Sequence, residues 1–228
     1  MQLSPPLRKV SPHSPSVSAR LPDFRWRLTR KVRRVLEEDR HVVVIGGPKI
    51  GKTYLAQQIK QTKKAVPIFD DVRGEHIEHL LNAPAPILIT TDISFLEESR
   101  ALGDEIFRVP LTTIPPQHLQ SIIASDWNIS RGHPALISSS PQKSKGPLCT
   151  KLCRQWQVLL KLNPMAQQAY REIMGLPAEL TPVQRYRTIR YRFGPQTKQI
   201  LDWLVCLGFL HRQKYTGGSA GIIPVLRV

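Results

Sequence analysis

The chain has few cysteines, few acidic side chains and no long hydrophobic run. Its three cysteines are an odd number in 228 residues, so no disulfide framework is expected. Cys149 and Cys153 have the C-x-x-x-C spacing of half a metal site, but no second Cys or His pair lies at a matching separation. The cysteine pattern therefore argues against a disulfide-rich secreted domain and against structural zinc.

The hydrophobic segments are too short for insertion into a membrane. No apolar run reaches the length of a membrane-spanning helix, and the first residues lack the apolar core of a secretory signal. We therefore expect a cytoplasmic protein with reduced thiols and no membrane partner.

The shortage of acidic residues is uneven along the chain. Overall, 33 Lys+Arg oppose 17 Asp+Glu, a net charge of +16. Residues 1–45 hold 10 basic and 4 acidic side chains, residues 46–150 hold 11 and 10, and residues 151–228 hold 12 and 3. Basic flanks around a nearly neutral middle favour a polyanionic partner, nucleic acid before membrane. A basic surface that keeps the protein soluble is the alternative interpretation.

Composition also predicts where the domains begin and end. Residues 1–22 are rich in Ser and Pro and contain no acid, which is typical of a disordered basic arm. A polar Ser/Pro/Lys linker is predicted over residues 138–147. These segments delimit a first domain at residues 23–137 and a second at residues 148–228.

The most informative stretch is Gly46–Thr53, G-G-P-K-I-G-K-T, here called the phosphate loop. It fits the pattern G-x-x-x-x-G-K-S/T at every fixed position. A β-branched run, residues 42–45, precedes it, and helix formers follow it up to Pro67. A strand, a glycine loop and a helix N-terminus direct backbone N–H groups at a polyphosphate. The candidate nucleotide-binding residues are Gly46, Gly47, Pro48, Lys49, Ile50, Gly51, Lys52, Thr53 and Tyr54. A glycine-rich turn of some other α/β protein is the alternative.

A second motif, A-V-P-I-F-D-D, ends in Asp70 and Asp71 and looks like a Walker B strand. Asp70 is expected to hold a nucleotide-bound Mg²⁺ from the tip of a strand beside the phosphate loop, together with the hydroxyl of Thr53. Asp71 follows where many such ATPases carry a Glu that orients water. Because aspartate is one methylene shorter, ATP hydrolysis is expected to be slow. The alternative is an acidic turn before Gly74.

The remaining pattern of the first domain predicts an α/β fold with a reduced parallel sheet and a short lid. Strands are expected at residues 86–91 and 106–111, and helices at residues 27–39, 75–81, 95–102 and 117–124. The strand 86–91 ends in two hydroxyls that are suited to sensing a γ-phosphate.

The second domain reads as helices at residues 166–174, from residue 181, and at residues 196–207, followed by strands at residues 211–215 and 222–227. Helices followed by a two-stranded wing are the element order of a winged helix. Interleaved Arg and Tyr residues give this unit its positive charge: Arg185, Tyr186, Arg187, Arg190, Tyr191 and Arg192.

These motifs resemble, in order, those of the STAND class of P-loop ATPases, which are related to AAA+ proteins. The NB-ARC-like members are the most similar. The matching residues are G-G-P-K-I-G-K-T-Y-L-A at 46–56, F-D-D-V at 69–72, I-L-I-T-T-D at 87–92, F-R-V-P-L at 107–111, G-H-P at 132–134 and G-F-L-H-R at 208–212.

The resemblance implies a role for several residues. Lys52 would hold the phosphates, Thr53 and Asp70 would hold Mg²⁺, Asp71 would position water, and Thr91 would sense the γ-phosphate. Pro134 would lie against the adenine.

The chain also departs from the family pattern. Asp92 stands where relatives often have a sensing arginine, and no M-H-D box closes the winged helix. The segment between the loop helix and Asp70 is so short that the Walker B strand is expected at the sheet edge. Arg100 lies where AAA+ relatives carry an arginine finger, and its simpler interpretation is a surface arginine.

Three functions follow as hypotheses. The first is an ATP/ADP-binding switch whose nucleotide state controls self-assembly or a protein partner, with slow or no hydrolysis. The second is a DNA-binding AAA+-like ATPase, of initiator or transposition-regulator type, that binds nucleic acid through the basic winged helix and arm. The third is a scaffold that has lost hydrolysis. The expected cofactors are ATP or ADP with Mg²⁺.

Overall fold

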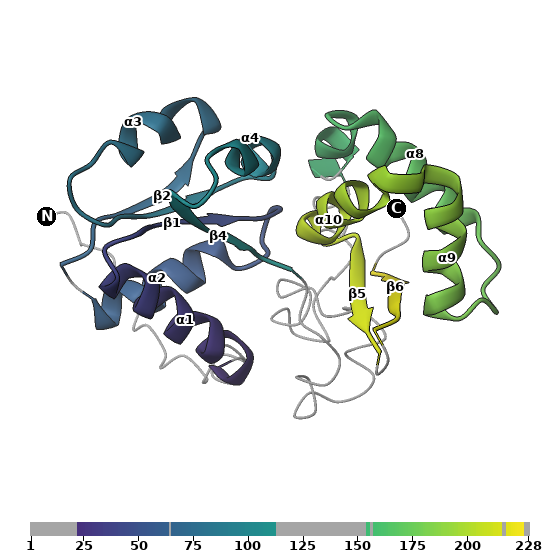
Figure 1. Cartoon of the computed structure of the whole chain (residues 1–228), viewed down its shortest axis with the longest axis horizontal. Coiled ribbons are helices and arrows are strands. Elements are labelled where there is room, and N and C mark those ends of the chain that lie inside the picture. Colours follow the sequence, from purple (N-terminus) through teal and green to yellow (C-terminus); the bar gives the residue numbers. More distant parts are fainter. Residues whose placement is uncertain (1–21, 64, 113–153, 156, 216–217, 226–228) are drawn as a thin grey trace, which may run out of the picture.

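The computed structural model describes residues 22–63, 65–112, 154–155, 157–215 and 218–225 (Figure 1). Several predicted features lie outside these residues. They are the basic arm before Pro22, the helix at 117–124, Pro134, the linker at 138–147, and Cys149 with Cys153.

Residues 22–112, here called the α/β unit, contain a parallel sheet of four strands in the order β2-β3-β1-β4. The strands are β1 (His41–Ile45), β2 (Ile68–Val72), β3 (Leu88–Thr91) and β4 (Ile106–Pro110). The helices are α1 (Pro22–Glu37), α2 (Lys52–Thr62), η2 (Gly74–His76), α3 (Ile77–Leu81) and α4 (Phe95–Ala101). The predicted α/β class, with a small parallel sheet, is thus confirmed.

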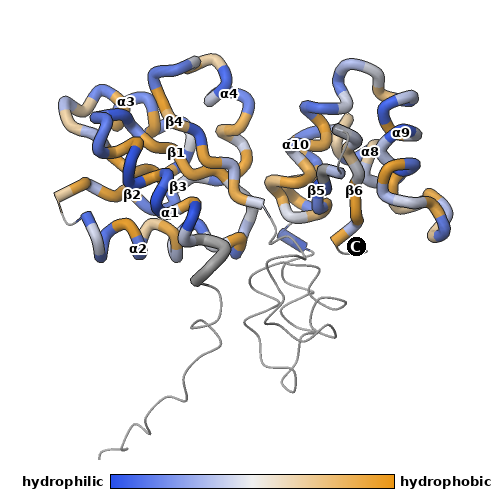
Figure 2. Tube along the Cα trace, turned by 60° about the horizontal axis from the view of Figure 1, so that its bottom comes forward, coloured by the Kyte–Doolittle hydropathy of each residue, from blue (hydrophilic) through white to orange (hydrophobic). Residues whose placement is uncertain are grey.

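The two faces of the sheet follow from the alternation of side chains along β1. Val42 and Val44 pack with α1 and α2, whereas Val43 and Ile45 face the core that contains α3 and α4. Helices therefore cover both faces, as Figure 1 shows, and Figure 2 shows hydrophobic strands in the middle of the unit. A strand buried on both sides requires the continuous Val-Val-Val-Ile run that the sequence contains.

The order of the strands corrects one expectation. Asp70 was expected on a strand next to the phosphate loop's strand, but β3 pairs with β1 and separates it from β2. β2 is the sheet edge, as its short connection to α2 predicted.

Described residues from 154 onward form the C-terminal unit. Its helices are α8 (Pro164–Gly175), α9 (Pro182–Phe193), η4 (Gly194–Gln196) and α10 (Thr197–Leu207). Thr181 caps α9 in a capping box with Gln184, and Pro182 occupies the first turn, as predicted. β5 (Leu210–Lys214) and β6 (Ala220–Pro224) form an antiparallel hairpin. These elements occur near the predicted residues, and the winged-helix assignment stays a prediction.

α10 docks the C-terminal unit onto the α/β unit. One cluster of buried apolar side chains continues from Ile45 and Ile89 in the sheet to Leu204, Leu207 and Phe209. Eight residues of α10 are buried. The two units therefore share an apolar core. Within the described residues, no helix has both the length and the hydrophobicity needed to cross a membrane.

Candidate nucleotide-binding site

The phosphate loop connects the buried end of β1 to the N-terminus of α2. α2 begins at Lys52, and Gly51 immediately before it has a left-handed backbone with φ of 98°. Lys49 also has a positive φ of 58°. No side chain caps the N-terminus of α2, and its first turn contains no acidic residue. The positive end of the helix and its amide groups are thus left for an anion.

Lys52 turns its ammonium group back onto the start of the phosphate loop. Its Nζ donates hydrogen bonds to the carbonyl oxygens of Gly46, at 2.9 Å, and Gly47, at 3.1 Å. Burial lowers the pKa of Lys52, and the opposing influences on this pKa come from Asp71, Asp92 and Asp70. Three carboxylates therefore lie within electrostatic reach of Lys52, although β2 is not adjacent to β1.

Thr90 holds the two aspartates at the end of β2. Its hydroxyl donates to Oδ1 of Asp70 and accepts the backbone N–H of Asp71 at 2.8 Å. Asp71 has a positive φ of 57°, which aspartate tolerates better than most residues, and the register of β2 against β3 shifts here. Asp70 and Asp71 are exposed, whereas Thr90 is fully buried. Sequence reasoning named the two hydroxyls that end β3 as possible phosphate sensors, but it did not predict that Thr90 bonds to the two aspartates.

Thr91 lies beside the first residue of the phosphate loop. Its neighbour across the sheet is Ile45, and its carbonyl oxygen accepts the Gly46 N–H at 3.4 Å. The Thr91 hydroxyl is buried and has no hydrogen-bond partner in the described part of the chain. A buried hydroxyl without a partner costs free energy unless something else bonds to it. Its position is compatible with the predicted sensor role, which stays a prediction.

The other predicted site residues are distributed around the loop. Ile50 is fully buried, Pro48 and Tyr54 are partly buried, and Lys49 and Thr53 are exposed. Asp92, which was considered only as a departure from the family pattern, belongs to the carboxylates near Lys52 and accepts the Ser94 N–H at 2.8 Å.

Gly47 joins the phosphate loop to the C-terminal unit. Its N–H donates to the carbonyl oxygen of Cys206, at the end of α10, at 2.8 Å. A Cβ at Gly47 would lie 2.7 Å from the Leu207 carbonyl oxygen, so only glycine fits here without a shift of the backbone. The backbone of Gly47 is thus contacted by Lys52 at its carbonyl oxygen and by α10 at its N–H.

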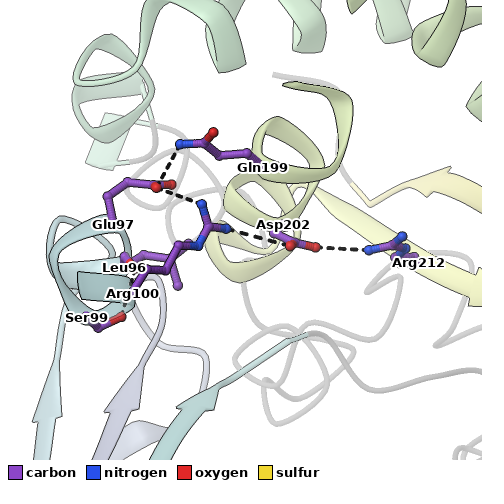
Figure 3. Close-up of polar contacts among 7 residues, drawn as sticks. All are labelled: Leu96, Glu97, Ser99, Arg100, Gln199, Asp202 and Arg212. Carbon is purple, nitrogen blue, oxygen red and sulfur yellow. Dashed lines mark hydrogen bonds and ion pairs between the residues drawn. The ribbon is translucent and has the colours of Figure 1, made fainter. Parts of the chain in front are cut away.

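Polar side chains connect α4 to α10 next to this contact (Figure 3). Oε2 of Glu97 accepts hydrogen bonds from Nη1 of Arg100 and from Nε2 of Gln199, both at 2.7 Å. Asp202 lies between Nη2 of Arg100 at 3.7 Å and Nη1 of Arg212 at 3.0 Å. These five residues are called the docking cluster. In the structure, Arg100 pairs with Asp202 across the two units, so it is more than a surface arginine.

A metal ion at this site would depend on the oxygen ligands near the phosphate loop. Within residues covered by the structure, no group of three or more His, Cys, Asp and Glu is arranged to hold a metal ion. A nucleotide-bound Mg²⁺ needs fewer protein ligands, because phosphate and water oxygens complete its octahedron. The hydroxyl of Thr53 and the carboxylate of Asp70 fit that requirement in chemical type.

Known proteins provide little further guidance. No family model and no curated protein matches the chain. A solved structure of Thermotoga maritima RuvB, described as a Holliday junction branch migration motor, is 12% identical, covers 88% of this chain and 91% of its own, and has a TM-score of 0.33. Two single-substitution variants of that protein, both 12% identical, give TM-scores of 0.34, with the same coverage, and 0.32, with 91% and 92% covered. At these TM-scores the likeness carries no argument about this chain.

Proposed function

We propose that the chain is an ATP/ADP-binding P-loop protein, of AAA+-related STAND type, whose nucleotide state controls the docking of its C-terminal unit and thereby a protein partner or self-assembly. The observation that carries this proposal is the double contact of Gly47, with Lys52 on one side and Cys206 on the other. A nucleotide that draws Lys52 away from Gly47 breaks the first contact and, by changing the position of Gly47, weakens or strengthens the second.

Binding of the polyphosphate rests on the first turn of α2. The amides that follow Gly51 and the ammonium group of Lys52 supply the positive charge. Lys52 exchanges the carbonyl oxygens of Gly46 and Gly47 for the β- and γ-phosphates. A bound Mg²⁺ would neutralise phosphate charge, and Thr53 and Asp70 are the residues that would hold it.

Hydrolysis is proposed to be slow or absent. Asp71 is the residue available to orient water. Its side chain is one methylene shorter than that of Glu, and its left-handed backbone lies at the register shift of the edge strand β2, so we expect it to position water poorly. Thr91 is the proposed sensor, because its buried hydroxyl is free to bond to a γ-phosphate oxygen.

Coupling to the C-terminal unit follows from the position of α10. A diphosphate and a triphosphate differ in how far they extend toward Lys52, so they bind the docked and undocked arrangements with different affinities. The shared apolar core opposes undocking, and the partly exposed docking cluster adds a smaller, salt-sensitive contribution.

Nucleotide binding by the Lys52→Ala variant tests this function. Removing the charge-assisted bonds of Lys52 should weaken ATP binding about 10- to 100-fold. Lys60→Ala is the matched control, because Lys60 is exposed on the same helix. Equal ATP affinity in wild type and Lys52→Ala would refute the proposal.

A second candidate function is DNA binding by the C-terminal unit, in the manner of an AAA+ initiator. Tyr191, 93% exposed, and the exposed Arg187 and Arg190 on α9 favour it. However, α10, the helix before the hairpin, is largely buried, and its last turn contacts the phosphate loop. DNA binding through α10 therefore requires undocking, and a DNA affinity unchanged by rising salt would exclude this candidate.

A further inference from the structure

The exposed side of α1 carries a row of cationic side chains. Arg27, Arg30, Lys31 and Arg34 are all exposed; Arg30 and Lys31 are adjacent, and each lies three or four residues from Arg27 and from Arg34. The opposite side of the helix is buried through Thr29, Val32, Val35 and Leu36. α1 lies with α2 on one face of the sheet, so this row is separate from α3 and α4 on the other face (Figure 1).

The positive charge of this row is largely unneutralised. Glu38 pairs with Arg34 at 3.0 Å, and Glu37 pairs with Lys63 of α2 at 2.8 Å. Among the side chains that the structure describes, which in α1 begin at Trp26, no carboxylate forms an ion pair with Arg27, Arg30, Lys31 or Arg33. The surface therefore attracts an anion with several charges rather than a single carboxylate.

An aromatic ring stands at the start of the row. Trp26 is 55% exposed, and the guanidinium of Arg30 lies 4.5 Å from its ring centroid. A large exposed ring beside a cationic row provides a face on which a base can stack while arginines contact phosphates. At the other side of the row, Lys31 lies 4.9 Å from the ring of Phe107 in β4, which joins α1 to the sheet edge.

A lipid surface fits this helix poorly. An amphipathic helix that lies in a membrane interface inserts its apolar side among acyl chains. In α1 that side, which includes Val32, Val35 and Leu36, is already part of the protein core. Only the charged side is available to a partner.

We propose that the exposed side of α1, from Trp26 to Arg34, binds single-stranded nucleic acid. Arginine predominates in the row, and its planar guanidinium bonds to two phosphate oxygens at once. From Arg27 to Arg34 the helix rises about 10 Å, enough to contact two or three phosphates of one strand. This binding is independent of the nucleotide site and of the proposed switch.

The test compares two double variants of the full chain by fluorescence anisotropy of a labelled single-stranded DNA. Arg27→Gln with Arg30→Gln removes two charges from α1. Arg187→Gln with Arg190→Gln removes two charges at the same spacing from exposed positions of α9, the rival DNA-binding surface. Thermal unfolding of each variant establishes that it folds, and Trp26→Ala probes stacking separately.

The α1 variant should lose about tenfold or more in affinity, and its slope of log K against log salt should flatten by roughly 1.4, about 0.7 for each charge removed. Trp26→Ala should weaken binding about 5- to 100-fold with little change in slope, as loss of base stacking does. The α9 variant should bind as wild type does.

Equal or greater loss in the α9 variant would overturn the proposal and assign binding to the C-terminal unit. Competition by polyglutamate as effective as competition by DNA would overturn it in favour of an acidic protein segment. Stronger binding to anionic vesicles than to DNA would overturn it in favour of a membrane.

Discussion

The backbone N–H of Gly47 and the carbonyl oxygen of Cys206 are joined at 2.8 Å, although 159 positions separate the two residues (206 minus 47). This hydrogen bond connects the phosphate loop to the last turn of α10. The carbonyl of the same glycine accepts a hydrogen bond from Lys52. A single residue, Gly47, therefore links the predicted phosphate-binding lysine to the C-terminal unit through its carbonyl and its amide.

Gly47→Ala should weaken docking. The new methyl group would lie 2.7 Å from the Leu207 carbonyl oxygen, so either α10 or the loop must shift, at a cost of about 1–3 kcal/mol. Gly175→Ala is the control, because a Cβ there meets nothing within 4 Å. Urea denaturation measures both free energies of unfolding. A Gly47→Ala variant as stable as Gly175→Ala would show that the contact is not tight.

The Arg100–Asp202 ion pair should contribute modestly to docking. Both side chains are about one-third exposed, at 35% and 32%, so solvent screening limits their coupling to roughly 0.5–1 kcal/mol. A double-mutant cycle with Arg100→Met and Asp202→Asn measures this energy. Arg192→Met breaks a pair with Glu172 inside the C-terminal unit and should leave docking unchanged. Zero coupling energy between Arg100 and Asp202 would show that the ion pair does not contribute to docking.

Thr90→Val should separate metal positioning from phosphate sensing. The change deletes the hydroxyl that bonds to Asp70 and Asp71, so the gain in ATP affinity on adding Mg²⁺ should shrink, while Thr90→Ser retains it. Thr91→Val removes a hydroxyl without a partner within the described structure, so the free energy of unfolding should not fall. The preference for ATP over ADP should be lost. Affinities measured with and without Mg²⁺ decide this. If Thr90→Val and Thr90→Ser behave alike, the hydroxyl has no positioning role.

The lowered pKa of Lys52 should produce proton uptake on nucleotide binding. Burial holds this pKa below its ordinary value of 10.5 in the folded chain. Between the folded pKa and 10.5 the unfolded chain binds more protons than the folded chain. The contribution of Lys52 to the free energy of unfolding therefore increases as pH rises through this range and decreases as pH falls.

A polyphosphate beside Lys52 favours the charged form, so binding at alkaline pH should take up protons and weaken as pH increases. Calorimetry in buffers of different ionisation enthalpy measures the uptake. Lys52→Met should abolish it, and proton release by the wild type would contradict the assignment.

Sequence patterns predicted those elements whose cause is local. The Val42–Ile45 run and the glycine loop after it predicted β1, the turn and α2, and Thr181 with Pro182 predicted the start of α9. Each pattern lies within a few residues, so no tertiary contact was needed to recognise it.

The rest of the site depends on contacts that local patterns do not encode. Arg100 pairs with Asp202 only because α10 packs beside α4, and 102 positions of sequence separate the two residues (202 minus 100). The choice between Thr90 and Thr91 depends on which face of β3 each occupies and on the register shift at Asp71. The insertion of β3 between β1 and β2 likewise follows from sheet order, which periodicity does not specify.

The reactivity of Cys206 toward alkylation reports whether the bound nucleotide controls the docking of α10. Its thiol is only 3% exposed in the docked arrangement, and burial, with Asp202 nearby, raises its pKa to about 12, so it should react slowly. In a Cys149→Ser, Cys153→Ser background, the rate with iodoacetamide is measured with Mg·ADP and with a non-hydrolysable Mg·ATP analogue. We predict that alkylation is about tenfold or more faster with the ATP analogue, which corresponds to a change of at least about 1.4 kcal/mol in the free energy of docking. The Lys52→Ala variant should show no such difference between the nucleotides. Equal rates in both nucleotides for the wild type would contradict nucleotide control of α10.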